Sequence, residues 1–243
     1  FGHLPMILGS DGKRLSKRHG AVGTQTFKDM GYLPESLINY LALLGWNPGN
    51  NDEIFDINYL INNFSIQNVN KKSAVFDMTK LDWVSSQKIL AKKSSELLEL
   101  INDFDSSWSS NNCNNDFLVK VIELIKDRLK TLSDAKDHSY FFKDPTGFDE
   151  NALKKCWKED TSGILDQFLS KLKKLDEWNV KTIDDLIRQC VEELSIGMGK
   201  LMQPLRLALA GDLIGPSMPD LMEILGKEVC SKRLENILEF KQS

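Results

Sequence analysis

Cysteine and histidine are scarce in this chain of 243 residues, and neither is grouped as a metal site requires. The cysteines stand at Cys113, Cys156, Cys190 and Cys230, and the histidines at His3, His19 and His138. Such separations form no Cys-x-x-Cys knuckle and no histidine ligand pattern, so we expect no metal site. Cysteines without a disulfide framework favour a reducing compartment, and we expect the protein in the cytoplasm.

Long apolar runs are also missing. No stretch approaches the roughly 20 apolar residues that a membrane-spanning helix needs, so we expect no membrane partner. The first residues lack the basic start and apolar run of a secretory signal, and no initiator methionine is present. A chain that opens within a strand is typical of an excised fragment.

A net positive charge is absent as well, because the formal charge at pH 7 is -4. This argues against unspecific coating of nucleic acid, which needs a basic protein, and we expect no DNA partner. Basic residues nevertheless gather locally, in 13–18, 71–93 and 196–210. Each of these stretches is compatible with a simple solvated face.

What the sequence does contain is helical periodicity. The apolar run from His3 to Gly9 predicts a strand, and Ser10-Asp11-Gly12 predicts a turn. From Thr24 onward, apolar residues recur at three- and four-residue spacing. Helices are predicted near 24–30, 34–44, 56–64, 77–90, 94–104, 116–130, 133–142, 149–158, 162–176, 180–195, 198–210, 219–225 and 227–240. The fold class is therefore mainly all-α, with stacked helical bundles after a short β-strand.

Tryptophan positions add expectations about the core. Four tryptophans lie near apolar helix faces and are expected to pack in the core, namely Trp46, Trp83, Trp157 and Trp178. Trp108 lies in the polar stretch 105–115, which we interpret as an exposed loop, so this tryptophan is a candidate for exposure.

The stretch Lys13-Arg14-Leu15-Ser16-Lys17-Arg18 is the one motif with evident chemistry. Cations on a mobile loop can close over a nucleotide and neutralise charge that develops on its phosphates. The hydroxyl of Ser16 can add a hydrogen bond, and flanking glycines let the loop hinge. A solvated basic hairpin is the alternative interpretation of the same residues.

Residues 12–20 resemble the Lys-Met-Ser-Lys-Ser loop of class I aminoacyl-tRNA synthetases, in the form found in glutamyl-tRNA synthetases. The resemblance continues in order along the chain. It includes Gly31-Tyr32-Leu33-Pro34-Glu35 and the residues up to Trp46, then 74–83, 202–211 and 225–228. Residues 94–195 match that family only loosely.

The resemblance implies a ligase that activates glutamate with ATP, accompanied by Mg²⁺, and attaches it to tRNA-Glu. In that family's terms, Arg14 and Lys17 occupy the two lysine places of the loop, Ser16 matches its serine, and Arg18 replaces its last serine. The second signature of the family, a His-Ile-Gly-His-like motif, is absent. We therefore expect a C-terminal portion that lacks most of the catalytic domain, is inactive by itself and does not retain ATP.

The remainder of the chain should then be the anticodon-binding arm, which is helical in the bacterial type of the family. We divide the chain into the end of the catalytic fold with its basic ATP loop (1–23), a helical connecting domain (24–93) and two helical anticodon-binding subdomains (94–147 and 148–243). We expect the protein to be a monomer.

Two arginines and a glutamine carry the expected anticodon contacts. By resemblance, Arg128 reads the third anticodon base, while Arg206 and the preceding Gln203 contact the anticodon. A guanidinium can donate two parallel hydrogen bonds to a base edge and can stack on a base. The alternative for Arg128 is a surface arginine paired with Asp127 or Glu123.

Two other functions remain open at this point. A helical scaffold or protein-interaction module without an RNA role has the same periodicity. A complete small enzyme with an unrecognised site is the third possibility, but no nucleophile–base pair or metal cluster supports it.

Overall fold

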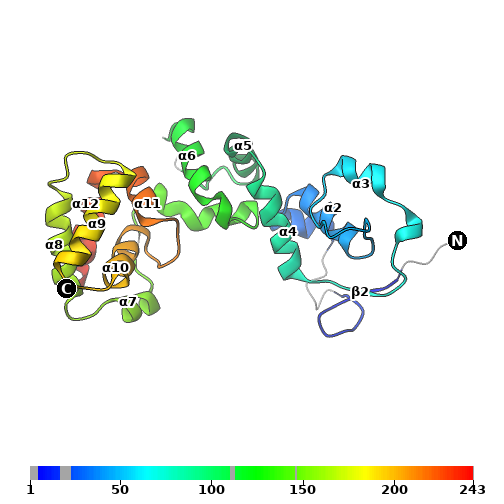
Figure 1. The fold of residues 1–243 in the computed structure, drawn as a ribbon, viewed down its shortest axis with the longest axis horizontal. Coiled ribbons are helices and arrows are strands. Elements are labelled where there is room, and N and C mark those ends of the chain that lie inside the picture. The colour runs from blue at the N-terminus through cyan, green and yellow to red at the C-terminus, as the bar shows by residue number, and fades with distance from the viewer. Residues whose placement is uncertain (1–4, 17–22, 110–112, 146, 243) are drawn as a thin grey trace. The chain divides into compact units, whose positions relative to one another are not determined.

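The computed structural model describes residues 5–16, 23–109, 113–145 and 147–242. It is mainly helical, as predicted (Figure 1). The early elements are β1 (Ile7–Leu8), α1 (Thr24–Asp29), α2 (Pro34–Leu43), α3 (Ile57–Asn63), the 3-10 helix η2 (Ile66–Asn68), β2 (Ala74–Val75), α4 (Met78–Leu90) and α5 (Ser94–Phe104). The later ones are α6 (Asn115–Ile125), the 3-10 helices η3 (Lys126–Arg128) and η4 (Leu132–Phe141), α7 (Glu150–Cys156), α8 (Thr161–Leu172), α9 (Val180–Glu193), α10 (Met198–Ala210), α11 (Met218–Leu225) and α12 (Lys227–Gln242).

Local capping explains where several helices begin. Pro34 opens α2 in its first turn, where the missing N–H costs nothing. The carboxylate of Asp77 accepts from the backbone N–H of Thr79 at 2.8 Å, which caps α4. Asn179 and Thr182 form a reciprocal capping box at the start of α9. These capping residues can be recognised in the sequence. Together with the apolar periodicity, they explain why the helices could be predicted.

The small sheet differs from the prediction. β1 pairs in parallel with β2, with Ile7 opposite Ala74 and Leu8 opposite Val75. The predicted strand is confirmed only at Ile7–Leu8, and its first residues, His3 and Leu4, lie outside the described residues. β2 has two residues, too few for a periodic signal, and its partner is far away in the chain.

The region after α6 also differs. The predicted helix 116–130 ends as an α-helix at Ile125 and continues as the 3-10 turn η3. The predicted helix 133–142 is the 3-10 helix η4, which is interrupted at His138 (φ -101°, ψ 18°). The side chain of Asp134 bonds to the backbone N–H of Lys130 and Thr131 here, which competes with regular α-helical bonding.

The chain folds as two compact units whose segments alternate. The first unit consists of Phe1–Trp108 and Lys126–Lys136, and the second of Ser109–Ile125 and Asp137–Ser243. The chain therefore passes from one unit to the other three times. Our four-part division of the chain by function stays a prediction.

In the first unit, α2 packs against α4. The main apolar cluster contains Phe27, Tyr32, Tyr40, Leu81 and Val84. A second, smaller cluster joins Trp46, Phe55 and Leu60. Helix α4 also contacts η3, so this core supports the turn that contains Arg128.

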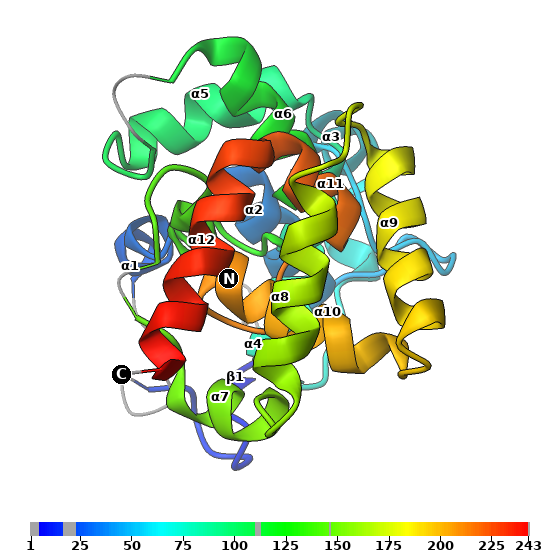
Figure 2. The ribbon, with the colours of Figure 1, turned by 90° about the vertical axis from the view of Figure 1, so that its left-hand side faces the viewer.

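In the second unit, α8 lies between α9 and α12 (Figure 2). Helix α10 packs against α7, α8, α9 and α12, which makes it a central element of this unit. Its residues Leu201, Leu205 and Leu209 are fully buried. The four cysteines are free thiols, and Cys156, Cys190 and Cys230 are buried.

The burial of Trp83 and Trp108 differs from what the sequence predicted. Trp83 is 39% exposed, so its predicted core position is wrong; it lies under the ammonium of Lys80, with Nζ 4.0 Å from the ring centroid. Trp108 is buried at 2% exposure, and its indole Nε1 donates to Asn102 Oδ1 at 2.6 Å. The polar residues that surround Trp108 in the sequence offer no sign of this burial.

Candidate nucleic-acid interface and basic loop

The basic loop begins in a tight hairpin at the end of β1. The N–H of Gly9 donates to the carbonyl of Lys13 at 2.8 Å, and the N–H of Leu15 donates to the carbonyl of Ile7 at 2.9 Å. Gly12 has φ +73°, the left-handed conformation that glycine adopts without steric cost. The turn predicted at residues 10–12 is therefore present.

Two of the four predicted ATP-loop residues belong to this hairpin. Arg14 forms an isolated bridge with Leu8, and its side chain is exposed. Ser16 is exposed as well. Lys17 and Arg18 lie outside the described residues. The described part of the loop thus presents cations and a hydroxyl to solvent, which suits phosphate contact and equally suits a solvated hairpin.

Arg128 ends η3 and is exposed. Its guanidinium nitrogen Nη1 contacts the carboxylate of the neighbouring Asp127, as the alternative interpretation expected. An exposed pair of this kind is worth about 0–1 kcal/mol, because water and salt screen both charges. The pairing therefore does not prevent Arg128 from exchanging Asp127 for another hydrogen-bond acceptor.

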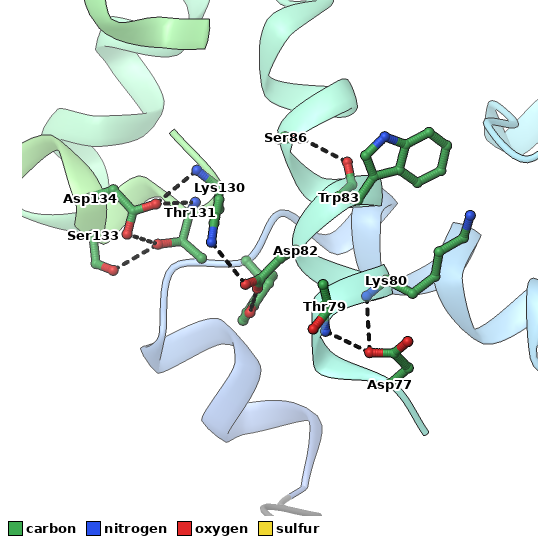
Figure 3. Close-up of polar contacts among 11 residues, drawn as sticks. Asp77, Thr79, Lys80, Asp82, Trp83, Ser86, Lys130, Thr131, Ser133 and Asp134 are labelled. Carbon is green, nitrogen blue, oxygen red and sulfur yellow. Dashed lines mark hydrogen bonds and ion pairs between the residues drawn. The ribbon is translucent and has the colours of Figure 1, made fainter. Parts of the chain in front are cut away.

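A polar network fixes the backbone that follows Arg128 (Figure 3). The carboxylate of Asp134 accepts from the backbone N–H of Lys130 at 2.8 Å and of Thr131 at 2.9 Å. The ammonium of Lys130 lies 3.4 Å from Asp82 Oδ2 on α4. The hydroxyl of Tyr32 donates to the other oxygen of Asp82 at 2.5 Å. Together these contacts anchor the segment to the core of the first unit.

The phenol of Tyr32 is held in its protonated form. Burial raises its pKa well above the usual value, and the hydrogen bond to the Asp82 carboxylate raises it further. Tyr32 therefore remains a hydrogen-bond donor to Asp82 throughout the physiological pH range.

Arg206 projects from α10 and is half-buried. Its Nη1 atom is buried, and a Cβ placed on Gly215 would lie only 2.7 Å from that atom. The same point lies 3.2 Å from the hydroxyl oxygen of Tyr140. The hydroxyl of Tyr140 is in turn 2.9 Å from Nδ1 of His138. Arg206 is thus enclosed on one side by a tyrosine and a glycine.

Gln203 lies one turn before Arg206 on the same helix and is exposed. Pro204 between them is buried inside α10. Positions three apart on a helix are neighbours on its surface, so Gln203 and Arg206 share one face. Arg128 belongs to the first unit, whereas Gln203 and Arg206 belong to the second.

Sequence reasoning missed the residues that support these arginines. Asp134 carried a weak signal as a capping residue, because Asp favours helix N-termini. Tyr140 and Gly215 carried none, since their proximity to Arg206 arises from tertiary packing. These supporting residues are visible only in the structure.

The described residues contain neither a cluster of metal ligands nor a helix that could span a membrane. Across 5–16, 23–109, 113–145 and 147–242, no group of three or more His, Cys, Asp or Glu residues could hold a metal ion. Within the same residues, none of the helices combines the length and apolar character that crossing a membrane demands.

Two family models match this chain. The model described as anticodon binding domain matches residues 90–238, and the model described as tRNA synthetases class I (E and Q), catalytic domain, matches residues 1–83. The first match includes η3, α10 and all three predicted anticodon-contact residues. The second ends within α4.

Individual relatives agree with the family models. The chain is 37% identical to glutamate–tRNA ligase 2 of Thermoanaerobacter pseudethanolicus over 100% of its own length and 51% of that protein. It is 40% identical to glutamate–tRNA ligase of Vesicomyosocius okutanii over 99% of its own length and 52% of that protein. The chain spans about half the length of the curated relatives it matches.

A crystal structure supports the same relationship. The structure of a glutamate tRNA ligase from Elizabethkingia meningosepticum in complex with its amino acid superposes with a TM-score of 0.83 at 33% identity. The superposition covers 98% of this chain and 51% of that one. Because the anticodon binding domain model matches well over half of the residues, the chain belongs to the aminoacyl-tRNA synthetase family of the glutamate–tRNA ligases and contains its anticodon binding domain.

Proposed function

We propose that residues 1–243 are the anticodon-reading part of a glutamate–tRNA ligase and bind tRNA-Glu. The match of the anticodon binding domain to residues 90–238 is the observation that carries this proposal. We further propose that the whole protein activates glutamate with ATP and transfers it to tRNA-Glu; the relatives reported above are named glutamate–tRNA ligases.

Arg128 is the proposed reader of the third anticodon base. It is exposed, its guanidinium forms a weak surface pair with Asp127, and the backbone after it is anchored through Asp134 and Asp82. A fixed backbone with an exchangeable guanidinium suits recognition of an unstacked base, because Arg can form two parallel hydrogen bonds with a base edge.

Arg206 and Gln203 are the second proposed contact. They share one face of α10, and α10 is held by packing against four helices of the second unit. A rigid helix positions side chains more reproducibly than a free loop does. An amide and a guanidinium on one face supply several donors and one acceptor for a base and its phosphate.

The basic loop is proposed as the ATP-phosphate contact of the whole protein. Arg14 and Ser16 are exposed at the base of the hairpin, and Lys17 and Arg18 follow them in sequence. Mg²⁺ would enter with ATP, neutralising its phosphates, rather than through a ligand cluster in the described residues. We propose a cytoplasmic monomer, which fits four free cysteines.

Fluorescence anisotropy with labelled, unmodified tRNA-Glu and tRNA-Gln tests the proposal at one fixed salt concentration, because phosphate contacts depend strongly on salt. We expect tighter binding of tRNA-Glu, and Arg128→Gln should reduce the ratio of the two affinities. A good base contact is worth about 1–3 kcal/mol, so the ratio should fall roughly five- to hundredfold.

Arg188→Gln is the matched control. Arg188 is an exposed arginine on α9 whose Nε lies 2.7 Å from Asp184, so it also loses a surface ion pair and one positive charge. This variant should leave the ratio unchanged. If wild type binds neither tRNA, the protein is better explained as a helical scaffold without an RNA role. An unchanged ratio in Arg128→Gln would defeat the assignment of that residue.

A further inference from the structure

Three groups converge on one point beside α10. A Cβ at Gly215 would lie 2.7 Å from Nη1 of Arg206 and 3.2 Å from the hydroxyl oxygen of Tyr140. Side-chain carbons do not approach other heavy atoms below 3.0 Å without displacing them. Position 215 therefore tolerates no side chain unless Arg206 moves, and its φ of +157° also disfavours one.

One arrangement of protons satisfies the polar atoms of Tyr140 and His138 beside Arg206. Tyr140 is buried, and its hydroxyl lies 2.9 Å from Nδ1 of His138, which is also buried. A guanidinium can only donate hydrogen bonds, whereas a phenol has one proton to donate and lone pairs that accept. The arrangement is satisfied when Tyr140 donates to His138 and turns its lone pairs toward Arg206.

We propose that Gly215 and Tyr140 are positioning residues that fix the guanidinium of Arg206 before RNA arrives. This inference rests on the proposed function of Arg206 as an anticodon contact. Gly215 supplies the space, Tyr140 supplies a polar wall, and His138 orients the phenol. Arg206 is half-buried although its Nη1 atom is buried, so other atoms of this residue remain accessible to RNA.

Holding the Arg206 side chain in place before binding reduces the conformational entropy that is lost when RNA binds. A free arginine side chain samples many rotamers, and immobilising it during binding reduces affinity. Enclosure of Nη1 selects the rotamer in advance, so the cost falls on folding instead of on recognition. Arg128 differs from Arg206, because its guanidinium contacts the exposed carboxylate of Asp127.

Gly215→Ala tests the proposal, with tRNA-Glu dissociation constants measured on the full chain. We expect binding about tenfold weaker, the size expected when one base contact is misplaced. Gly226→Ala is the matched control, because Gly226 also has a positive φ, +83°, but nothing lies within 4 Å of its added Cβ. Its affinity should stay within about twofold of wild type.

The same substitution is then made in an Arg206→Ala background. If Gly215 acts through Arg206, the effect of Gly215→Ala disappears there, as a double-mutant cycle requires. An equal effect in both backgrounds would overturn the positioning role. If Arg206→Ala itself binds tRNA-Glu normally, the proposed function of Arg206 is wrong, so the two failures are distinguishable.

Tyr140→Phe provides a second, milder variant. It keeps the ring and removes the hydroxyl, so the second unit should retain its helical circular dichroism. We expect weaker tRNA-Glu binding in the wild-type background and no further loss in the Arg206→Ala background. Unchanged affinity in both backgrounds would remove Tyr140 from the proposal.

Discussion

Replacing Gly31 by alanine should destabilise the first unit more than the same replacement at a glycine with open space around it. Gly31 has φ +85°, and an added Cβ would lie 2.7 Å from the backbone nitrogen of Ser133 and 3.1 Å from that of Leu132. The carbonyl of Gly31 also accepts from the N–H of Leu132 at 2.9 Å. The obstacle is backbone, so it cannot rotate away.

The magnitude follows from three contributions. A left-handed conformation costs an L-residue about 1–2 kcal/mol. Displacing the 132–133 backbone adds about 1–3 kcal/mol of overpacking, and weakening its hydrogen bond adds about 1 kcal/mol. We expect a loss of about 3–6 kcal/mol in the free energy of unfolding. Gly49→Ala, at φ +91° with nothing within 4 Å, should lose only about 1–2 kcal/mol.

Urea unfolding followed by circular dichroism, with both variants and wild type in parallel, measures the difference. We expect a clearly lower midpoint for Gly31→Ala than for Gly49→Ala. Similar midpoints for the two variants would show that the 132–133 backbone does not resist the added carbon, and the close packing under η4 would then be refuted.

Two further predictions concern the carboxylates that anchor the first unit. Asp134→Ala removes the acceptor for the N–H of Lys130 and Thr131 and should lower the free energy of unfolding by about 1–2 kcal/mol, with a smaller loss in Asp134→Asn, as urea midpoints would reveal. The pKa of Asp105 is lowered to about 2, chiefly by the hydrogen bond from Lys136 and then by Ser107. Because the folded-state pKa lies below the unfolded value of about 3.9, this stabilisation is complete above that value and is lost as the pH falls toward 2. Asp105→Asn should therefore flatten the decline of the urea midpoint between pH 4 and 2, and an equally steep decline would contradict this.

The helices were predictable because their signals are local. Pro34, Asp77 and Asn179 begin helices through contacts within a turn, and apolar residues spaced along one helix face, such as Leu201 and Leu205, are buried. The candidate site residues were named from short motifs in the same way. Their roles stay predictions; Gln203 and Arg206 lie on the predicted helix α10, whereas Arg128 lies in the 3-10 turn η3 and not in an α-helix.

The features that escaped prediction depend on contacts between distant residues. β2 exists because Ala74 pairs with Ile7, which lies far earlier in the chain. The enclosure of Arg206 by Gly215 and Tyr140 has the same origin. No short sequence pattern predicts such contacts, because the residues around each partner in the sequence give no sign of the other partner.

The alternation of segments between the two units has a consequence for synthesis on the ribosome. A nascent chain leaves the ribosome with its N-terminus first, and domains generally fold as units once their residues are available. The first unit needs Lys126–Lys136, so it cannot be completed until Ser109–Ile125 has also emerged, although that segment belongs to its neighbour. Helix α6 is therefore synthesised before most of the second unit to which it belongs. The first unit can fold at that stage, because the segments before and after α6 are both part of it.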